Sequence, residues 1–226
     1  MLRLRVTAPF AAFRPFSAGG FRPTADFITP SAAFGLLLNI AGVEMRGADD
    51  QTSGATLISK DLPRVRLAVG ACSFPGRQQI FQQLHNYPVG TSGREKAPMA
   101  MGSKYNIKPV TRALLSSIDA LIAVDSPEIE EGLRKGLRGE SDRAYGLPFL
   151  GDNSFLPDRL EEAGDTTAAH WYCSLEGGEE TEKKQISRFT TTIDRGDVSR
   201  SRTALFAPLK EPSPEIPPSA WVEVIY

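Results

Sequence analysis

The sequence predicts an α+β fold of the ferredoxin-like kind, and three patterns predict it. An alternating apolar and basic run at the N-terminus indicates a strand with one buried face. Two segments that combine a capping residue with a following proline indicate helix starts. In chain order the predicted elements run strand, helix, strand, long excursion, strand, helix, loop and strand. This is the ferredoxin-like order with one inserted excursion.

The first strand and the first helix are predicted within residues 1–42. Residues 1–7 alternate leucine or valine with arginine, which is typical of a strand that buries one face. Thr29 is the expected N-cap of the helix, because Pro30 fits the first helical position and good helix formers follow. Gly42 is expected to end this helix.

A basic loop between this strand and this helix predicts an anion site. Arg14 and Arg22 lie in the loop, and Thr29 and Ser31 lie at the helix start. Backbone N–H groups at a helix N-terminus favour negative charge. We therefore expect a phosphate group to bind near these four residues.

The remaining elements of the ferredoxin-like unit are read from periodicity and breakers. Strands are expected at residues 64–72, 118–124 and 170–175, and a helix capped by Ser126 is expected to run from Pro127 to Gly139. Apolar residues at four-residue spacing form one buried stripe on that helix. A loop at residues 145–153, with Gly146 and Gly151, follows it.

Residues 76–109 are expected to form a long basic excursion from this unit. Its first part has apolar residues at helical spacing from Ile80 to Tyr87, and its later part is rich in glycine, lysine and arginine. Excursions of this length in a compact domain are usually functional or disordered, and both can hold when a segment orders on its ligand.

The chain is expected to divide into a large unit and a small one. Residues 1–175 form the predicted ferredoxin-like domain. Residues 176–226 carry short alternating stretches punctuated by prolines, which predicts a small β appendage packed on that domain.

Composition excludes several classes of protein. Hydrophobic residues make up 41% of the 226 residues, so a substantial core is expected, but no apolar run has the length of a membrane span. No signal peptide is predicted, and Cys72 and Cys173 lack the spacing of a disulfide framework or metal site. We expect a cytoplasmic protein that needs no metal or other cofactor and no membrane.

Charge is distributed unevenly along the chain although the net charge is −1. Residues 60–112 carry nine lysines or arginines against two acidic residues, whereas residues 113–184 carry seven basic and sixteen acidic residues. A basic surface on a nearly neutral protein indicates a polyanion site beside a surface that faces protein or solvent. Chance clustering of solvated charges is the alternative.

Two motifs resemble the CRISPR-associated Cas-five family. They are RVTAPFAAFRPF followed by FITPSAAFGLLLNIAG near the N-terminus, and YGLPFLGDN at residues 145–153. The second motif is similar to the subgroup first described in a myxobacterial developmental locus, the DevS-like subgroup. The resemblance covers roughly residues 1–175 and implies an RRM-like or RAMP-type domain whose excursion at 76–109 is a thumb-like element.

The resemblance implies a non-catalytic RNA-binding subunit of a type I Cascade-like surveillance complex. Such a subunit holds the 5′ handle of the CRISPR RNA, docks the backbone and large subunits, and meets target DNA through the complex. The residues expected at RNA are Arg14, Arg22, Thr29, Ser31, Arg64, Arg66, Arg77, Lys104, Tyr105, Lys108, Arg112, Gly146 and Gly151.

Two other functions stay open. One branch of the family cuts precursor RNA without a metal, and His85 with Tyr87 are the candidates for that chemistry here, although no adjacent lysine–histidine pair is present. A protein-interaction scaffold without RNA contact is the other alternative. It predicts that an acidic partner covers the basic half of the chain.

Overall fold

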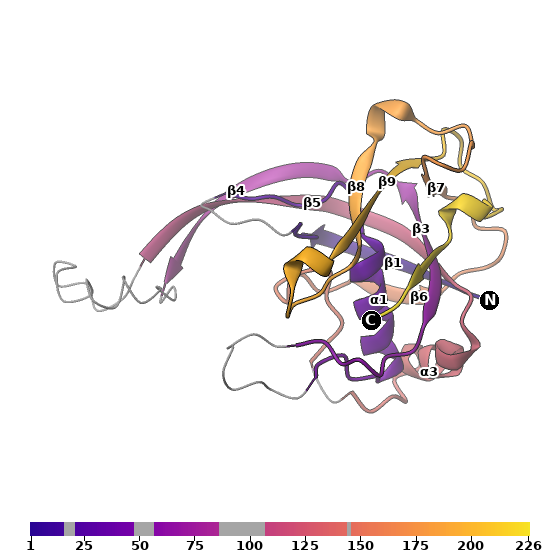
Figure 1. Ribbon diagram of the computed structural model, residues 1–226, viewed down its shortest axis with the longest axis horizontal. Coiled ribbons are helices and arrows are strands. Elements are labelled where there is room, and N and C mark those ends of the chain that lie inside the picture. The colour runs from indigo at the N-terminus through magenta and orange to yellow at the C-terminus, as the bar shows by residue number, and fades with distance from the viewer. Residues whose placement is uncertain (16–20, 48–56, 86–106, 144–145) are drawn as a thin grey trace.

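The computed structural model describes residues 1–15, 21–47, 57–85, 107–143 and 146–226 (Figure 1). Its strands are β1 (Leu2–Ala11), β2 (Phe21–Arg22), β3 (Val65–Ser73), β4 (Gly76–His85), β5 (Ile107–Val124), β6 (Arg159–Glu162), β7 (His170–Ser174), β8 (Ser187–Thr192), β9 (Arg202–Pro208) and β10 (Val222–Val224). Its helices are α1 (Pro30–Ala41) and α3 (Pro127–Leu137), with short 3-10 turns η2 (Lys183–Gln185), η3 (Val198–Arg200) and η4 (Pro218–Ala220). Among the described residues, no helix is long and apolar enough to cross a membrane.

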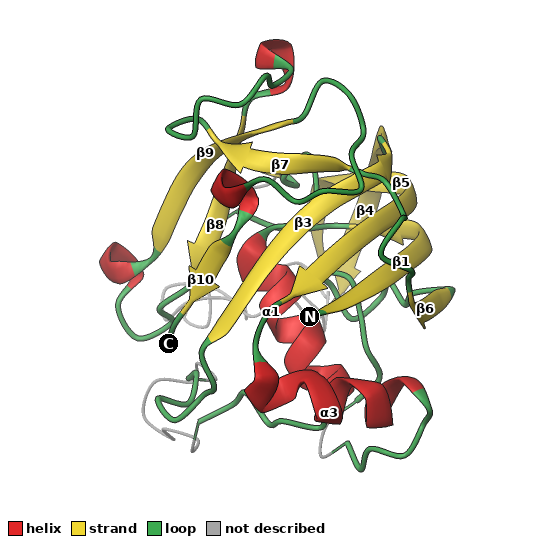
Figure 2. Cartoon of the chain, turned by 90° about the vertical axis from the view of Figure 1, so that its right-hand side faces the viewer, coloured by secondary structure: helices red, strands yellow, loops and turns green. Residues whose placement is uncertain are grey.

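The strands order as β6-β1-β5-β3-β7-β9-β8, with β10 on β3 and both β2 and β4 on β5 (Figure 2). Within this sheet, β6, β1, β5 and β3 are mutually antiparallel neighbours, and α1 connects β1 to β3. This is the ferredoxin-like arrangement, so the predicted α+β fold class is confirmed.

The fourth ferredoxin-like strand differs from the prediction. We expected it at residues 170–175, but β6 takes that place beside β1, and β7 instead pairs with β3 on the other side. The four residues of β6 are Arg-Leu-Glu-Glu, which have too little apolar character to be recognised as a strand. Only pairing with β1 makes this segment extended.

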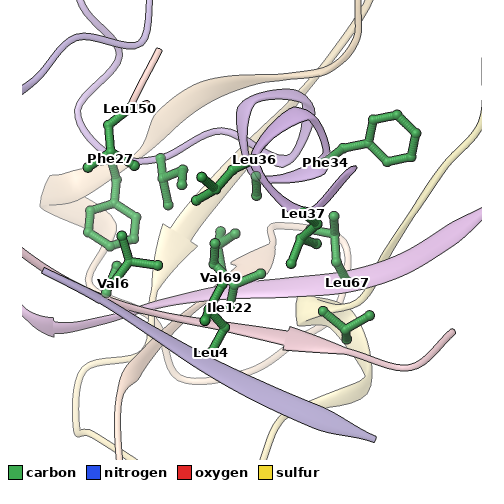
Figure 3. Close-up of a cluster of buried hydrophobic side chains, with 14 of the residues drawn as sticks. Leu4, Val6, Phe27, Phe34, Leu36, Leu37, Leu67, Val69, Ile122 and Leu150 are labelled. Carbon is green, nitrogen blue, oxygen red and sulfur yellow. The ribbon is translucent and has the colours of Figure 1, made fainter. Parts of the chain in front are cut away.

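The main core lies between the sheet and the two helices (Figure 3). Leu4 and Val6 of β1 face it, as the alternation predicted, and Phe34 and Leu37 of α1 belong to the same buried cluster from the helix layer. All four side chains are fully buried. Burial of apolar surface on this scale is the dominant favourable contribution to folding.

A second, smaller cluster covers the opposite face of the sheet. Trp171 of β7 packs there with Leu121 and Ala123 of β5. The guanidinium of Arg3, which also points to this face, is buried and donates hydrogen bonds to three backbone carbonyl groups. The basic residue nearest the N-terminus is therefore structural.

The ends of α1 agree with the sequence-based expectation. The Thr29 hydroxyl accepts a hydrogen bond from the Ala32 N–H at 3.2 Å, and Pro30 occupies the first helical position. Gly42 ends the helix in the left-handed conformation, with φ of 78°.

We predict that Thr29→Ala lowers the free energy of unfolding by about 1 kcal/mol, the usual cost of losing an N-cap. Thr29→Ser keeps the hydroxyl and should restore most of that stability. Urea unfolding of the three proteins measures both values. Equal stability of the alanine variant and the wild type would contradict the capping role.

The start of α3 differs from the expectation in one respect. Ser126 precedes Pro127 as predicted, but its side chain makes no capping hydrogen bond. Its hydroxyl instead accepts a hydrogen bond from the Arg66 N–H at 2.8 Å. The serine therefore ties the helix to β3, a role that depends on a residue sixty positions away.

α3 lies unusually close to the C-terminal end of α1. Gly132 and Gly136, one helical turn apart, face Ala41 and Ile40. A Cβ atom added at Gly136 would lie 1.8 Å from the Ile40 carbonyl oxygen. The absence of a side chain at this position therefore allows the two backbones to approach.

A long hairpin of β4 and β5 extends from the body of the molecule (Figure 1). The helical spacing of the apolar residues from Ile80 onward does not correspond to a helix, because Gly76–His85 is a strand paired along its whole length with β5. Residues 86–106, which include Tyr87, Lys104 and Tyr105, lie outside the described residues. The strand predicted at 118–124 is the last part of the 18-residue β5.

Candidate nucleic-acid interface

Three of the predicted arginines meet where the hairpin joins the body. Arg14 and Arg112 both form ion pairs with the carboxylate of Asp152, and the Arg112 Nη2–Asp152 Oδ2 distance is 2.7 Å. Arg22 of β2 lies in register beside Arg112 of β5. We call Arg14, Arg22, Arg112 and Asp152 the arginine cluster. The cluster has three guanidinium groups and one carboxylate, which pairs with two of them, so it carries a net positive charge.

Arg112 is the buried centre of the arginine cluster. Only 5% of its surface is exposed, and its guanidinium lies over the Phe155 ring at 4.6 Å from the centroid. Burial lowers the pKa of Arg112, and the positive charges of Arg14 and Arg22 lower it further. The charge of Asp152 raises this pKa but does not outweigh the other effects. Its Nε atom is buried without a hydrogen bond among the described residues, whereas its Nη2 atom is paired with Asp152. Three guanidinium groups thus stand against one carboxylate, and one buried donor lacks an acceptor.

Asp152 is the counter-charge that holds the cluster together. Burial is the largest single influence on its pKa and would raise it, but hydrogen bonds from Ser154 and the charges of Arg112 and Arg14 outweigh burial. The pKa of Asp152 is therefore below its ordinary value of 3.8. Sequence reasoning did not connect Asp152 with these arginines, because the residues are separated by 40 or more positions.

Gly151 positions Asp152 by a close backbone approach. Its φ is 75°, and an added Cβ would lie 2.2 Å from the carbonyl oxygen of Ala12. The Ala12 N–H also donates a hydrogen bond to the Leu150 carbonyl at 3.2 Å. The loop thereby packs against the end of β1. This packing explains the glycine by contact with the protein's own backbone, and RNA contact at Gly151 and Gly146 stays a prediction.

A groove of about 580 Å³ lies beside the arginine cluster, along one flank of α1. Four arginines line it, and three of them, Arg46, Arg143 and Arg195, were not predicted at the site. Its apolar lining includes Met45 and Phe149. Basic groups around a partly apolar groove suit a ligand that combines negative charge with flat apolar surface, as a nucleotide does.

Thr29 and Ser31 line the groove at the start of α1, as expected. Both residues are buried, and their hydroxyl oxygens lie 3.1 Å apart. Because the Thr29 hydroxyl already accepts the Ala32 N–H, it is engaged with the helix. Contact of either residue with RNA stays a prediction.

The other predicted cations are not gathered with the cluster. Arg77 of β4 pairs with Asp26 at 2.6 Å. Arg66 pairs with Asp125 and lies over the Trp221 ring. It lies beside the C-terminal end of β5, and that end is twelve residues, or about 40 Å, along the strand from Arg112. Arg64 is exposed just before β3. Arg66 therefore lies far from the arginine cluster, and Arg77 is paired with a different carboxylate from the one at its centre.

The catalytic alternative falls largely outside the described structure. His85 is the last residue of β4, but its side chain and the whole of Tyr87 lie outside the described residues, as does the side chain of Lys108 in β5. Among the residues that are described, no group of three or more histidine, cysteine or acidic side chains is placed to hold a metal ion.

The structure defines a ferredoxin-like domain with an extended hairpin as the class of fold. The chain belongs to the CRISPR-associated Cas5 family: the family model described as CRISPR-associated protein (Cas_Cas5) matches residues 1–130. This confirms the family that the N-terminal motif indicated. The matched region ends before the loop at 145–153, on which the DevS-like subgroup assignment rests.

Comparison with one solved structure shows the same fold. A chain from a structure titled CRISPR RNA-guided surveillance complex superposes with a TM-score of 0.55 at 17% sequence identity, covering 97% of this chain and 92% of that chain. A structure titled crystal structure of Cas protein gives a TM-score of 0.46 at 16% identity, covering 96% of this chain and 99% of the other. No curated protein matches in sequence.

Proposed function

We propose that this chain is a non-catalytic RNA-binding subunit of a type I CRISPR surveillance complex, of the DevS-like subgroup. In this role it holds the 5′ handle of the CRISPR RNA and docks the large and backbone subunits of a Cascade-like assembly. The arginine cluster next to the groove on α1 is the observation that supports RNA binding most strongly. It concentrates positive charge beside a surface that accommodates a base.

The charge distribution supports a division between an RNA side and a protein side. Positive charge gathers in residues 1–40 and 60–112, whereas residues 113–184 are strongly acidic. An RNA backbone attracts the first group and repels the second. The acidic part is therefore proposed to face partner subunits or solvent, and the hairpin of β4 and β5 is proposed to be the thumb-like element.

Removing the exposed arginine of the cluster tests RNA binding directly. We expect Arg14→Gln to weaken binding of a single-stranded repeat RNA by about tenfold at moderate salt, because one charge-assisted phosphate contact is lost. The slope of log affinity against log salt concentration should decrease by about 0.7. Charge reversal in Arg14→Glu should weaken binding more. Filter retention of end-labelled RNA over a salt series measures affinity and slope.

A matched control removes a cation elsewhere on the surface. Lys210 is exposed and pairs with Glu180 at 3.4 Å, in the segment that follows β9. Lys210→Gln should leave both affinity and salt slope unchanged. If Arg14→Gln and Lys210→Gln bind RNA as the wild type does, the arginine cluster is not the RNA site.

The same samples distinguish the two alternative functions. Specific metal-independent cleavage of the repeat RNA that disappears in His85→Ala would favour the endoribonuclease. The scaffold would be favoured if the chain alone neither retained nor cleaved RNA. In that case, complexes assembled by co-expression with the partner subunits should also show no contact between RNA and Arg14. Salt-sensitive retention of intact RNA is the result that the proposed function requires.

A further inference from the structure

We propose that Phe21 and Phe81 form a stacking platform for unpaired RNA bases midway along the β4–β5 hairpin. This inference rests on the proposed RNA-binding function and extends it to a surface that the arginine cluster does not include. Its basis is the register of three neighbouring strands, the exposure of the two rings and the polar groups around them.

The register places the two phenylalanines on one face. Phe81 of β4 and Phe21 of β2 both lie directly opposite Thr111, which belongs to the central strand β5. Residues directly opposite each other in neighbouring strands share a face of the sheet. Because neighbouring strands lie about 4.8 Å apart, the two backbones are separated by about 10 Å. Two rings at this separation leave room for bases to stack on them.

Both rings are open to solvent. Phe81 is 67% exposed and Phe21 is 46% exposed, whereas Ala113 and Leu115, further along the same face of β5, are buried. Neither ring contacts another aromatic ring among the described residues. Exposed phenylalanine on a flat strand is a liability for aggregation, so two of them in register indicate a surface that is covered in use.

The surroundings favour nucleic acid over a protein partner. Gln79 and Gln83 lie on the same face of β4 and are exposed, and amides of this kind hydrogen-bond base edges. The sequence has a single acidic residue, Glu95, between Asp61 and Asp119. The nearby Asp26 is neutralised by Arg77. Aromatic rings among amides and cations are typical of sites for single-stranded nucleic acid.

The arginine cluster lies on the opposite face of the same ribbon. Arg22 and Arg112 are the strand neighbours of Phe21 and Thr111, and successive side chains in a strand point to opposite faces. An RNA strand whose phosphates bind the arginine cluster and whose bases stack on the platform would therefore pass around the edge of the ribbon, from one face to the other. This placement makes the two sites separable by mutation.

Affinity for a fluorescently labelled oligoadenylate and a matched oligouridylate tests the platform in the full chain. Phe81→Ala should weaken binding about fivefold or more at every salt concentration, and Phe21→Ala combined with it should weaken binding further. The salt slope should stay unchanged, because no phosphate contact is lost. Phe74→Ala, which removes a comparably exposed phenylalanine from the turn between β3 and β4, is the matched control and should bind normally.

Two conservative variants separate stacking from apolar docking. Phe81→Trp keeps an aromatic face and should retain affinity, and its fluorescence should be quenched when RNA binds. Phe81→Leu keeps apolar surface but loses the ring, so it should bind RNA as poorly as the alanine variant. Stacking would be overturned if Phe81→Leu bound RNA normally. If, in addition, only Phe81→Ala failed to bind a partner subunit, the surface would be a protein contact.

The platform and the proposed function fail in different ways. The double alanine variant could bind RNA with wild-type affinity and salt slope while Arg14→Gln still bound RNA weakly. This result would overturn the platform and leave the RNA-binding function intact. A wild-type chain that binds neither oligonucleotide nor repeat RNA would overturn both.

Discussion

Gly136→Ala is expected to lower the free energy of unfolding by about 2 kcal/mol. A Cβ atom at this position would lie 1.8 Å from the carbonyl oxygen of Ile40 and 2.9 Å from its Cγ2 atom. Because a backbone oxygen cannot move aside as a side chain can, α3 must shift away from α1 and disturb the core beneath them. Overpacking of this kind costs about 1–3 kcal/mol and sometimes more, and the better helix propensity of alanine offsets only about 1 kcal/mol.

Two glycine controls separate packing from backbone conformation. Gly164 has no positive φ and open space around it, so Gly164→Ala should have little effect. Gly139 has a φ of 76° but nothing within 4 Å of an added Cβ, so Gly139→Ala should cost only the left-handed strain, about 1–2 kcal/mol. Urea unfolding of the three variants ranks them. A Gly136→Ala protein as stable as Gly164→Ala would mean that α3 does not approach α1 as closely as described.

Asp152→Asn is expected to cost about 2–3 kcal/mol of stability at neutral pH. The substitution removes the carboxylate that neutralises Arg112, whose side chain is only 6% exposed. Breaking a buried pair by removing one partner costs about 3–5 kcal/mol, and we expect less because the Arg14 side of the cluster reaches solvent. RNA binding should strengthen in this variant under the proposed function, because no carboxylate competes with phosphate for Arg14.

The pH dependence gives the Asp152 prediction a second readout. The folded-state pKa of Asp152 is below 3.8, so its contribution is present above pH 4 and is lost as pH falls through the folded pKa. The stability difference between wild type and Asp152→Asn should therefore shrink on acidification below pH 4. Glu140→Gln, which breaks the exposed Glu140–Arg138 pair, should have no measurable effect on stability at neutral pH. A constant difference between wild type and Asp152→Asn from pH 7 to pH 2 would exclude the ion pair as its cause.

Local patterns in the sequence were sufficient for the elements whose burial repeats regularly. The alternation in β1 follows from a strand with one face on the core, and Thr29, Pro30 and Gly42 mark α1 because capping depends on neighbouring residues only. The family was also readable from the N-terminal motif, and the family match over residues 1–130 bears this out. These features depend on residues a few positions apart.

Pairing and close approach between distant segments were decided by the tertiary structure alone. β6 is a strand only because β1 offers it an edge, and Ser126 turns from a cap into an acceptor for Arg66 because β3 lies beside it. The apolar residues from Ile80 onward have helical spacing, but pairing of Gly76–His85 with β5 along the whole segment makes it a strand.

The candidate site shows the same division between composition and placement. The sequence by itself determined that residues 1–40 and 60–112 are basic and that Arg14, Arg22 and Arg112 are candidates for an anion site. The tertiary structure decided that Arg14 and Arg112 converge on Asp152 with Arg22 in register beside Arg112. It also decided that Phe21 and Phe81 lie on either side of one threonine. The physical reason is that charge and apolar character belong to each residue. The neighbours that bury, neutralise or expose a residue are set by strand register and packing across the whole chain.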